Sequence, residues 1–523
     1  MRSLALLLSF SVGFLSLSQE IAWVRIVGFA YQGKPQAFSF VLVVFLAGIA
    51  SGAYVGKKLC ERFDNIIGIA AWSLVFAGLV DFSLLTLLPM IFKMDPTLLR
   101  LALLSFSILI TAAAKAILFP VVHHMGSALN DRLGRSVSTV YFANILGSTT
   151  GPLITGLLLL EWLSAANTMR LIAACTLGLA AVTLLNIKTV HAMVTRVSFV
   201  VMAAVTALAL IGIDKSNTAL IYSMAEAAPG TIKHLVENRH GVIHVVAGKD
   251  NIDTVFGGNV YDGHTTTDLH SNVNGMNRTY LLHALMPAPK RVLVIGLATG
   301  AWLKVLTMNP KIEHFDVVEI NPGYAEITKN YAELKSILDD PRVEIHYTDG
   351  RHWLRTTDHR YDLIVMNTTW YWRAYSTNLL SQDFFRIVKE RLNPGGIFAF
   401  NTTWSGDAFI TAVDGFKYAY LYGNFAYASD HDFRGEIAHA PERLLALTDN
   451  NKPVFNANSK ADMDAIDALM QRKFETIDEK IASSPVRPEI ITDQNMLTEF
   501  KHGLKFGRQF ITVYVDSSKQ PEK

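Results

Sequence analysis

A glycine-rich turn and two acidic residues recur where predicted β-strands end in the second half of the chain. The apolar run Val292–Ile295 leads into Gly296–Gly300, whose small residues allow a ligand to approach the backbone. Glu319 closes the next predicted strand, 23 positions after Gly296, near the spacing at which an acid binds a ribose diol. Asp349 closes the following strand and could accept from an adenine amino group. We therefore predict a nucleoside pocket, with ordinary turn acids as the alternative.

Alternating strands and helices must position these residues. The predicted strands are Arg291–Ile295, His314–Glu319, Val343–Tyr347, Tyr361–Met366 and Gly396–Asn401. The predicted helices are Ala301–Met308, Tyr324–Leu334 and Ser381–Arg391. This is a doubly wound α/β, Rossmann-like domain. Before it, His234–Val236, Val242–Val246 and Thr254–Phe256 predict a small antiparallel meander.

The first 215 or so residues are different in character, because long apolar runs with at most one charge dominate them. We expect about seven membrane spans, which are Leu4–Ala30, Gln36–Gly56, Ile66–Ile91, Leu101–Val122, Val137–Leu160, Leu171–Asn186 and Val197–Ile213. The predicted domains are a transmembrane helical bundle (1–215), a β meander and entry segment (216–290), and the nucleoside-binding domain with a C-terminal extension (291–523).

Some residues inside the predicted spans are costly in lipid. Glu20, Arg25, Asp81 and Lys115 would each cost on the order of 3 kcal/mol or more facing acyl chains, so we expect them inside the bundle with partners among themselves. The four-residue glycine spacing at Gly48, Gly52 and Gly56, and at Gly147 and Gly151, predicts close helix contacts.

Composition excludes several classes of protein. A formal net charge of +2 gives no field to attract nucleic acid, so we expect no nucleic-acid partner. Two cysteines, Cys60 and Cys175, are too few for a disulfide framework or a thiolate metal cluster, and we expect no metal site.

These motifs resemble those of membrane-fused spermidine synthase-like proteins, which belong with the polyamine aminopropyltransferases. The similar segments in the apolar part are Gly13–Ser16 with Gln19–Arg25, Phe45–Gly48 with Gly52, and Tyr141–Gly147. In the soluble part they are Tyr261–Gly263 and Tyr280–His283.

The resemblance implies S-adenosylmethionine or its decarboxylated form as cosubstrate, with methylthioadenosine as the product of aminopropyl transfer. It implies Glu319 on the ribose and Asp349 near the adenine. The candidate nucleoside-binding residues are Gly296, Ala298, Thr299, Gly300, Glu319, Ile320, Asp349, Gly350, Tyr280 and His283.

Two positions depart from the pattern of aminopropyltransferases. Thr299 stands where they carry the aspartate that holds the aminopropyl amine. Asn367 stands where they carry the acid that helps to deprotonate the attacking amine, and an amide cannot accept a proton at neutral pH. We therefore expect an acceptor other than putrescine.

The loop after Asn367 is aromatic and basic, which suits an apolar or anionic acceptor. The candidate acceptor residues are Trp370, Tyr371, Trp372, Arg373 and Tyr375, with Asp493 from a segment that resembles the family's closing segment. The candidate catalytic residues are Asn367, Asp268 and His264, with surface or capping roles as the alternative for the last two.

Three readings of the reaction stay open. They are aminopropyl-type transfer from a sulfonium donor, methyl transfer from intact S-adenosylmethionine to a membrane-associated substrate, and nucleoside sensing coupled to the bundle without catalysis. A lipid or a membrane protein could be the acceptor, and the chain could form a homo-oligomer. We expect a multi-pass protein of a bacterial inner membrane. Basic residues place the N-terminus in the cytoplasm. Seven spans would put the soluble domain outside, but the cytoplasmic origin of the cosubstrate favours a cytoplasmic domain.

Overall fold

The computed structural model describes residues 2–126, 133–186, 213–225, 231–367, 370–483 and 487–501. The chain divides into two compact units. The first holds residues 1–230 and 237–242, and the second holds residues 231–236 and 243–523.

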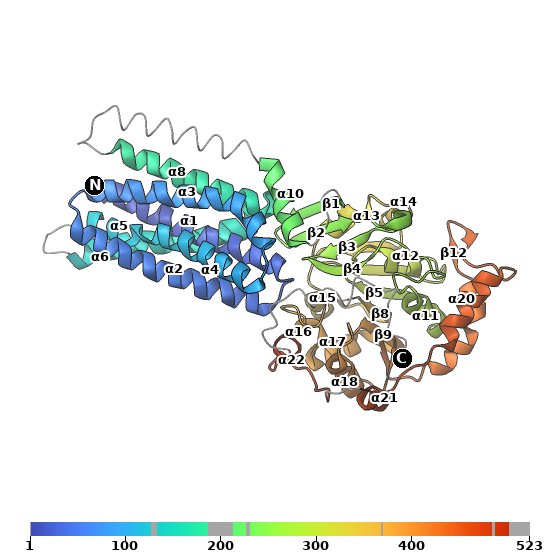
Figure 1. Ribbon diagram of the computed structural model, residues 1–523. Helices are drawn as coiled ribbons and strands as arrows, with labels where there is room; N and C mark the ends of the chain where they lie inside the picture. The colour runs from blue at the N-terminus through green and yellow to red at the C-terminus, as the bar shows by residue number, and fades with distance from the viewer. Residues whose placement is uncertain are drawn as a thin grey trace. The chain divides into compact units, whose positions relative to one another are not determined.

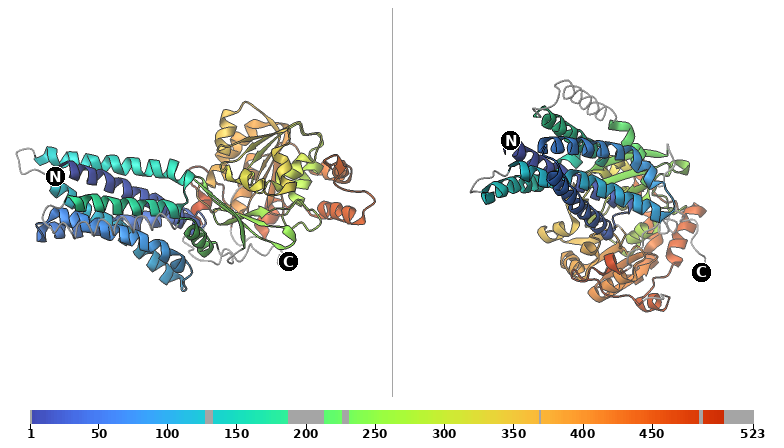
Figure 2. Two further views of the ribbon diagram at one scale, coloured as in Figure 1. Left: turned by 90° about the horizontal axis from the view of Figure 1, so that it is seen from above. Right: turned by 60° about the vertical axis from the view of Figure 1, so that its left-hand side comes forward.

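The first unit is a bundle of long helices that lie side by side (Figures 1 and 2). Its helices are α1 (Arg2–Ala30), α2 (Pro35–Arg62), α3 (Ile66–Phe92), α4 (Thr97–Ala116), α5 (Leu118–Gly126), α6 (Leu133–Ile154), η1 (Thr155–Leu159), α7 (Leu160–Trp162), α8 (Ala165–Leu185) and α10 (Ile213–Met224). Six stretches of the described residues are long and apolar enough to cross a membrane, with α4–α5 and α6–α7 each counting as one. The seventh predicted span, 197–213, lies outside the described residues except for Ile213.

The predicted glycine contacts are present in the bundle. A Cβ atom on Gly48 would lie 2.6 Å from the carbonyl oxygen of Leu109, and Gly52 faces the backbone of Ala113 on the same helix, α4. Gly147 and Gly151 face the backbone of α1 in the same way. These glycines therefore let α2 approach α4, and α6 approach α1, closer than any larger residue would allow.

A polar triad joins three helices of the bundle. Lys115 and Asp81 are fully buried and form an ion pair. Gln19 completes the triad: its Nε2 donates to Asp81 Oδ1 at 2.7 Å, and its Oε1 accepts from Lys115 Nζ at 2.7 Å. The expected pairing therefore occurs between Asp81 and Lys115. Glu20 and Arg25 are half-buried, and Arg25 donates to the backbone carbonyl of Arg239.

The second unit contains a four-stranded antiparallel sheet, in the order β1-β2-β3-β4, and a seven-stranded sheet. The strands are β1 (Ile232–Asn238), β2 (Gly241–Val246), β3 (Thr254–Gly257), β4 (Val260–His264), β5 (Arg291–Ile295), β6 (His314–Val318), β7 (Val343–His346), β8 (Tyr361–Met366), β9 (Leu392–Asn401), β10 (Tyr418–Tyr422), β11 (Phe425–Ser429), β12 (Thr448–Asp449) and β13 (Lys452–Pro453). The helices are η2 (Lys249–Asn251), α11 (Asn277–Leu285), α12 (Ala301–Thr307), α13 (Gly323–Thr328), α14 (Ala332–Lys335), η3 (Ser336–Leu338), α15 (Gly350–Thr356), α16 (Thr377–Leu380), α17 (Gln382–Arg391), α18 (Gly406–Gly415), η4 (Arg434–His439), α19 (Ala440–Leu445), α20 (Lys460–Gln471), α21 (Ile477–Ala482) and α22 (Leu497–Phe500).

The large sheet has the order β10-β11-β9-β8-β5-β6-β7, and the strands from β7 to β9 run parallel. From β5 the chain adds β6 and then β7 on one side, and it then adds β8 and β9 on the other side of β5. The strand order therefore switches direction at β5. One face packs on α11, α12, α19 and α20, and the other on α15, α17 and α18 (Figure 1). In such sheets the ligand binds outside the carboxyl ends of the strands at the switch point. That position is where the chain places Gly296–Gly300.

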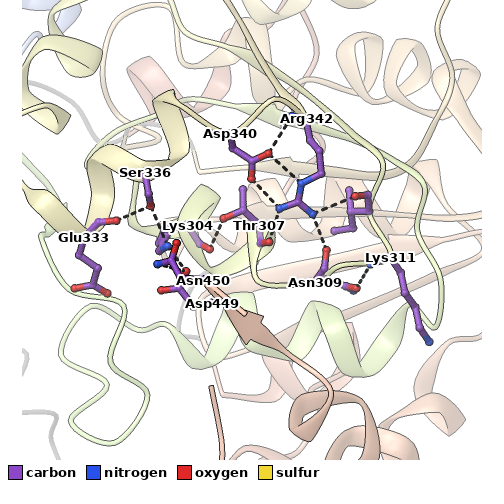
Figure 3. Close-up of polar contacts among 11 residues, drawn as sticks. Lys304, Thr307, Asn309, Lys311, Glu333, Ser336, Asp340, Arg342, Asp449 and Asn450 are labelled. Carbon is purple, nitrogen blue, oxygen red and sulfur yellow. Dashed lines mark hydrogen bonds and ion pairs between the residues drawn. The ribbon is translucent and has the colours of Figure 1, made fainter. Parts of the chain in front are cut away.

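A polar network anchors the helix that follows this turn (Figure 3). Arg342 donates to the carbonyls of Thr307 at 2.7 Å and Asn309 at 3.0 Å, so it caps the C-terminal end of α12. Asp340 binds the same guanidinium at 2.7 Å. The buried Lys304 reaches Ser336 at 2.9 Å and Asp449 at 2.6 Å. α12 is thereby fixed to η3, to the segment just before β7 and to β12.

Candidate active site

The glycine-rich turn adopts backbone conformations that explain its composition. Gly296 has φ +90° and Gly300 has φ +82°, in the region that favours glycine. Ala298 also has a positive φ, at +47°. A Cβ atom on Gly296 would lie 3.1 Å from the carbonyl oxygen of Asn367, so the turn passes close to the end of β8.

Glu319 lies directly behind this turn. Its Oε2 accepts from the backbone N–H of Leu297 at 2.8 Å, and its Oε1 accepts from the N–H of Asn321 at 2.8 Å. The side chain is buried, and this burial raises the pKa of Glu319 to about 7 even though the two backbone donors oppose the shift. The carboxyl group is therefore held at the turn, and it changes charge near neutral pH.

Asp349 lies at the end of the loop after β7. Its Oδ1 caps α15 by accepting from the N–H of His352 at 2.8 Å. Gly350 must be small, because a Cβ atom there would lie 2.6 Å from Ile295 at the end of β5. Ile320, next to Glu319, exposes 55% of its surface. The turn, Glu319 and Asp349 thus lie at the ends of three adjacent parallel strands.

Tyr280 and His283 are placed differently. Both lie in α11 and are buried against α12, where the His283 ring lies 3.1 Å from the carbonyl of Val305 and the Tyr280 hydroxyl 3.6 Å from Met308 Sδ. Burial lowers the pKa of His283 to about 4. The structure does not bring these two residues to the turn, and their contacts support the helix that follows it.

Asn367 ends a directional chain of hydrogen bonds. Arg278 Nη1 donates to Asn424 Oδ1 at 2.7 Å, Asn424 Nδ2 donates to Asn401 Oδ1 at 3.0 Å, and Asn401 Nδ2 donates to Asn367 Oδ1 at 3.0 Å. A guanidinium can only donate, so it fixes which atom of each amide accepts. The N–H of Thr403 also donates to Asn401 Oδ1, at 2.9 Å, which fixes Asn401 independently. The NH₂ group of Asn367 therefore faces away from Asn401.

Thr299 adjoins the end of β4. A Cβ atom on Gly263 would lie 3.4 Å from the methyl group of Thr299, so the His264 backbone is close to the turn. The His264 ring lies 3.1 Å from Thr254 Oγ1, and burial lowers the pKa of His264, which favours the neutral ring. The His264 ring itself lies against Thr254 and Tyr261 in the small sheet.

The carboxylate of Asp268 is engaged by backbone N–H groups of the residues that follow it. It accepts from the backbone N–H groups of His270 at 3.1 Å and Ser271 at 2.9 Å. Although partial burial raises the pKa of Asp268, these donors and the His270 ring lower it to about 2 overall. A carboxylate of such low basicity is a poor general base.

The first residues of the aromatic loop contact two other segments of the chain. Trp370 Nε1 donates to the carbonyl of Tyr261 at 3.2 Å, and its ring stacks on Trp372 with 6.4 Å between centroids. The N–H of Tyr371 donates to Thr403 Oγ1 at 3.1 Å. Tyr375 has φ +69° and exposes 77% of its surface. Thr368 and Thr369 lie outside the described residues.

Glu499 holds the far end of this loop. Its two carboxylate oxygens accept from the N–H groups of Tyr375 at 3.0 Å and Thr377 at 3.1 Å. Glu499 is buried, at 5% exposure. A residue near the C-terminus therefore fixes the backbone of the predicted acceptor loop.

Arg373 is engaged with the small sheet. It donates to the carbonyl of Gly257 at 3.2 Å. Tyr324 donates its hydroxyl to Asp262 on β4. Burial raises the pKa of Asp262, and the Tyr324 hydroxyl and the Arg373 guanidinium oppose that shift. Asp262 thus lies close enough to interact with the charge of Arg373.

Asp493 pairs with Arg351, whose Nη1 donates to its Oδ1 at 2.8 Å, and it accepts from Ser381 Oγ at 2.6 Å. The ion pair lowers the pKa of Asp493. These bonds fasten the C-terminal segment to α15 and to the start of α17.

Comparison with known proteins gives a family match for part of the second unit. Residues 279–412 match the family model described as the spermine/spermidine synthase domain. The similarity to this family covers that part of the chain. The matched range begins in α11 and includes the glycine-rich turn, Glu319, Asp349 and the aromatic loop.

The relatives of this domain carry consistent names. The polyamine aminopropyltransferase of Streptococcus pneumoniae serotype 4 is 34% identical over 118 residues, which are 22% of this chain and 41% of that protein. That of Alkaliphilus oremlandii is 41% identical over 92 residues, 17% of this chain and 32% of that protein. The chain thus matches about two fifths or less of these two relatives.

Among solved structures, the spermidine synthase of Thermotoga maritima aligns with 46% of this chain and 85% of its own, with a TM-score of 0.38 and 16% identity. A spermidine synthase in complex with the transition-state analogue AdoDATO aligns with a TM-score of 0.39 and 17% identity over 46% of this chain and 86% of its own.

Sequence reasoning missed several residues of this site. Asn401 ends β9 and would have been found by the strand-end rule that selected Glu319. Asp262 lies in the Tyr261–Gly263 segment but received no role. The Arg278–Asn424 and Glu499–Tyr375 bonds have no local signal, because they join residues 146 and 124 positions apart in sequence.

Proposed function

We propose that this chain is a membrane-embedded, spermidine synthase-like transferase that uses a sulfonium nucleoside as its alkyl donor. The observation that carries this proposal is the placement of Glu319 and Asp349 at neighbouring strand ends beside the Gly296–Gly300 turn, within the spermine/spermidine synthase domain. The proposed donor is decarboxylated S-adenosylmethionine or S-adenosylmethionine itself.

In this proposal each strand end contacts one part of the donor. The ionised carboxylate of Glu319 accepts from the ribose hydroxyls, and Asp349 accepts from the adenine amino group through the oxygen that does not cap α15. The exposed side chain of Ile320 covers the adenine ring. The positive-φ turn brings backbone close to the donor, as its glycines allow.

The proposed reaction is a displacement at the carbon attached to the sulfonium. A lone pair of the acceptor forms the new bond to carbon, and the C–S pair leaves with sulfur, which becomes a neutral thioether. With an aminopropyl donor the leaving group is methylthioadenosine. The positive sulfur makes this departure easy, so the protein mainly aligns the acceptor.

The Asn367 amide favours an acceptor other than putrescine. Its NH₂ group can donate but cannot take a proton from an ammonium or amine nucleophile. The acceptor would then have a hydrogen-bond acceptor atom opposite Asn367. Any proton that the acceptor releases would go to water or to His264, whose lowered pKa favours the neutral ring. The aromatic side chains of the loop suit a lipid or membrane-protein acceptor.

Methyl transfer is the second candidate function, and Thr299 is the residue that favours it. A threonine in place of an acid leaves room for the carboxylate of intact S-adenosylmethionine without charge repulsion. A nucleoside sensor without catalysis would need the same donor pocket but form no product.

One experiment separates these functions. The full chain in detergent or membranes is incubated with labelled S-adenosylmethionine or with its decarboxylated form, and products are identified by mass spectrometry. We expect labelled methylthioadenosine and a modified membrane component. Recovery of S-adenosylhomocysteine would indicate methyl transfer. Donor binding with no product from either donor would contradict catalysis, and the Glu319→Gln variant serves as the control for site occupancy.

A further inference from the structure

Strands β6 and β7 carry matched pairs of metal-ligating side chains. His314 and Asp316 lie two residues apart on β6, and Glu344 and His346 lie two residues apart on β7. Side chains two residues apart on a strand share a face. Asp316 is the register partner of Glu344, so all four side chains lie on one face of the sheet at its edge.

The donor atoms of this cluster are closely spaced. Asp316 Oδ1 lies 3.3 Å from His314 Nε2 and 3.1 Å from His346 Nε2. Glu344 lies 3.9 Å from His314 Nε2 and 3.8 Å from His346 Nε2. Donors around a tetrahedral Zn²⁺ ion at about 2.0–2.2 Å are separated by about 3.3–3.5 Å, so small side-chain movements would complete a coordination shell.

Neighbouring residues orient the cluster. Arg291 Nε donates to the other oxygen of Asp316, Oδ2, at 3.0 Å, which leaves Oδ1 toward the histidines. The ring of Trp353 stacks on His346 with 4.0 Å between centroids. Such outer contacts to ligands are the second layer of a protein metal site. His359 lies 3.6 Å from Asp316 Oδ2, on the Arg291 side.

Charge and exposure also suit a divalent cation. The Asp316 side chain is 1% exposed, whereas Glu344 is 61% exposed, so the site has a buried anchor and an open entrance. With neutral histidines, the cluster holds two negative charges, on Asp316 and Glu344, and one positive charge, on Arg291. A bound divalent ion would compensate the remaining negative charge.

We propose that His314, Asp316, Glu344 and His346 bind one divalent transition-metal ion of the zinc type. Imidazole together with carboxylate ligands suits Zn²⁺ and its neighbours rather than Mg²⁺, which prefers oxygen ligands alone. The ion would tie the edge strand β7 to β6. The carbonyl of His346 accepts from the N–H of Glu319 at 3.0 Å, so the ion would also stiffen the strand behind the donor pocket.

The test uses the full chain in detergent, purified without a histidine tag and stripped with a chelator. Titration with ZnCl₂ against a fluorescent chelator should show one ion per chain, with a dissociation constant on the order of 1 μM or tighter. The variants His314→Gln and Glu344→Gln should each weaken binding by about tenfold or more. His431→Gln, an exposed histidine after β11 at the opposite side of the sheet, should bind Zn²⁺ as the unaltered chain does.

Glu344→Gln keeps the test decisive if His314→Gln fails to fold, because the Glu344 side chain is largely exposed. Circular dichroism and methylthioadenosine binding would establish that each variant is folded. Absence of saturable Zn²⁺ binding, or equal binding by a folded Glu344→Gln variant, would overturn the proposal and leave the cluster as an ion-pair network. Failure of the transferase assay would not affect this result.

Discussion

Glu319 is the residue whose charge state should set how tightly the donor binds. Its pKa of about 7 lies above the ordinary value of 4.5 because of burial. When no donor is bound, burial favours the neutral carboxyl of Glu319. The stability that this neutral carboxyl contributes to the fold is fully present below pH 4.5 and is lost as the pH rises through about 7. Hydroxyl donors of a ribose bind the ionised form better, so donor binding has the opposite pH dependence.

We expect methylthioadenosine affinity to fall as pH drops below about 7, and Glu319→Gln to remove this dependence. The variant should also bind about tenfold or more weakly at alkaline pH, because it loses a charged acceptor. Calorimetry at pH values on both sides of 7 measures both effects. A variant with unchanged affinity would show that Glu319 does not contact the nucleoside.

Asn367 should decide which acceptors are used. An aspartate there could accept from Asn401 Nδ2 as the asparagine does, so the hydrogen-bond chain would survive the change. We expect the double variant Thr299→Asp, Asn367→Asp to form spermidine from putrescine about 10²-fold faster than the unaltered chain, because it regains a general base and an amine-binding acid. Asn367→Ala is the control. Efficient spermidine synthesis by the unaltered chain would contradict this interpretation.

At the scale of elements, parallel strands were the most predictable part of the fold. β5 and β8 have the predicted bounds, because each ends in a run of apolar residues, Val292–Ile295 and Leu363–Met366. The predicted helix Tyr324–Leu334 is divided into α13 and α14, since Asn330 bonds back to the carbonyl of Ile327 at 3.1 Å. β10 and β11 were not predicted from sequence; β11 pairs with β9, and β10 pairs with β11.

The network around Arg342 should govern the stability of α12 (Figure 3). Arg342→Leu removes donors from the carbonyls of Thr307 and Asn309, at a cost of about 1.5–3 kcal/mol for bonds to a charged group. We expect amide hydrogen exchange in α12 to quicken by about tenfold or more. Lys329 is exposed and lies just after α13, so Lys329→Ala should leave the hydrogen exchange of α12 unchanged.

The buried triad should be essential to the helical bundle. Lys115→Met leaves the Asp81 carboxylate buried without its cation, which typically costs about 3–5 kcal/mol. We expect a large loss of folded protein in detergent, measured by size-exclusion chromatography. The exposed pair Lys58–Glu61 provides the matched control, and Lys58→Met should cost no more than about 1 kcal/mol. Equal behaviour of the two variants would contradict a structural role for the triad.

At the scale of the whole molecule, the chain joins an apolar bundle to a second unit that holds the segment similar to the spermine/spermidine synthase domain. The six long apolar helices support membrane embedding. We expect the protein to stay in the membrane fraction after alkaline carbonate extraction and to need detergent for release. Release by carbonate alone would show that the helices do not span a bilayer.

The bond between Glu499 and the aromatic loop gives an order of events during synthesis. Tyr375 and Thr377 emerge from the ribosome more than 120 residues before the residue that fixes their backbone. Every strand of the large sheet, and the helices that pack on its two faces, are complete by then. The loop proposed to choose the acceptor is therefore the last part of the site to be fixed, and a nascent chain could bind a nucleoside before it could select an acceptor.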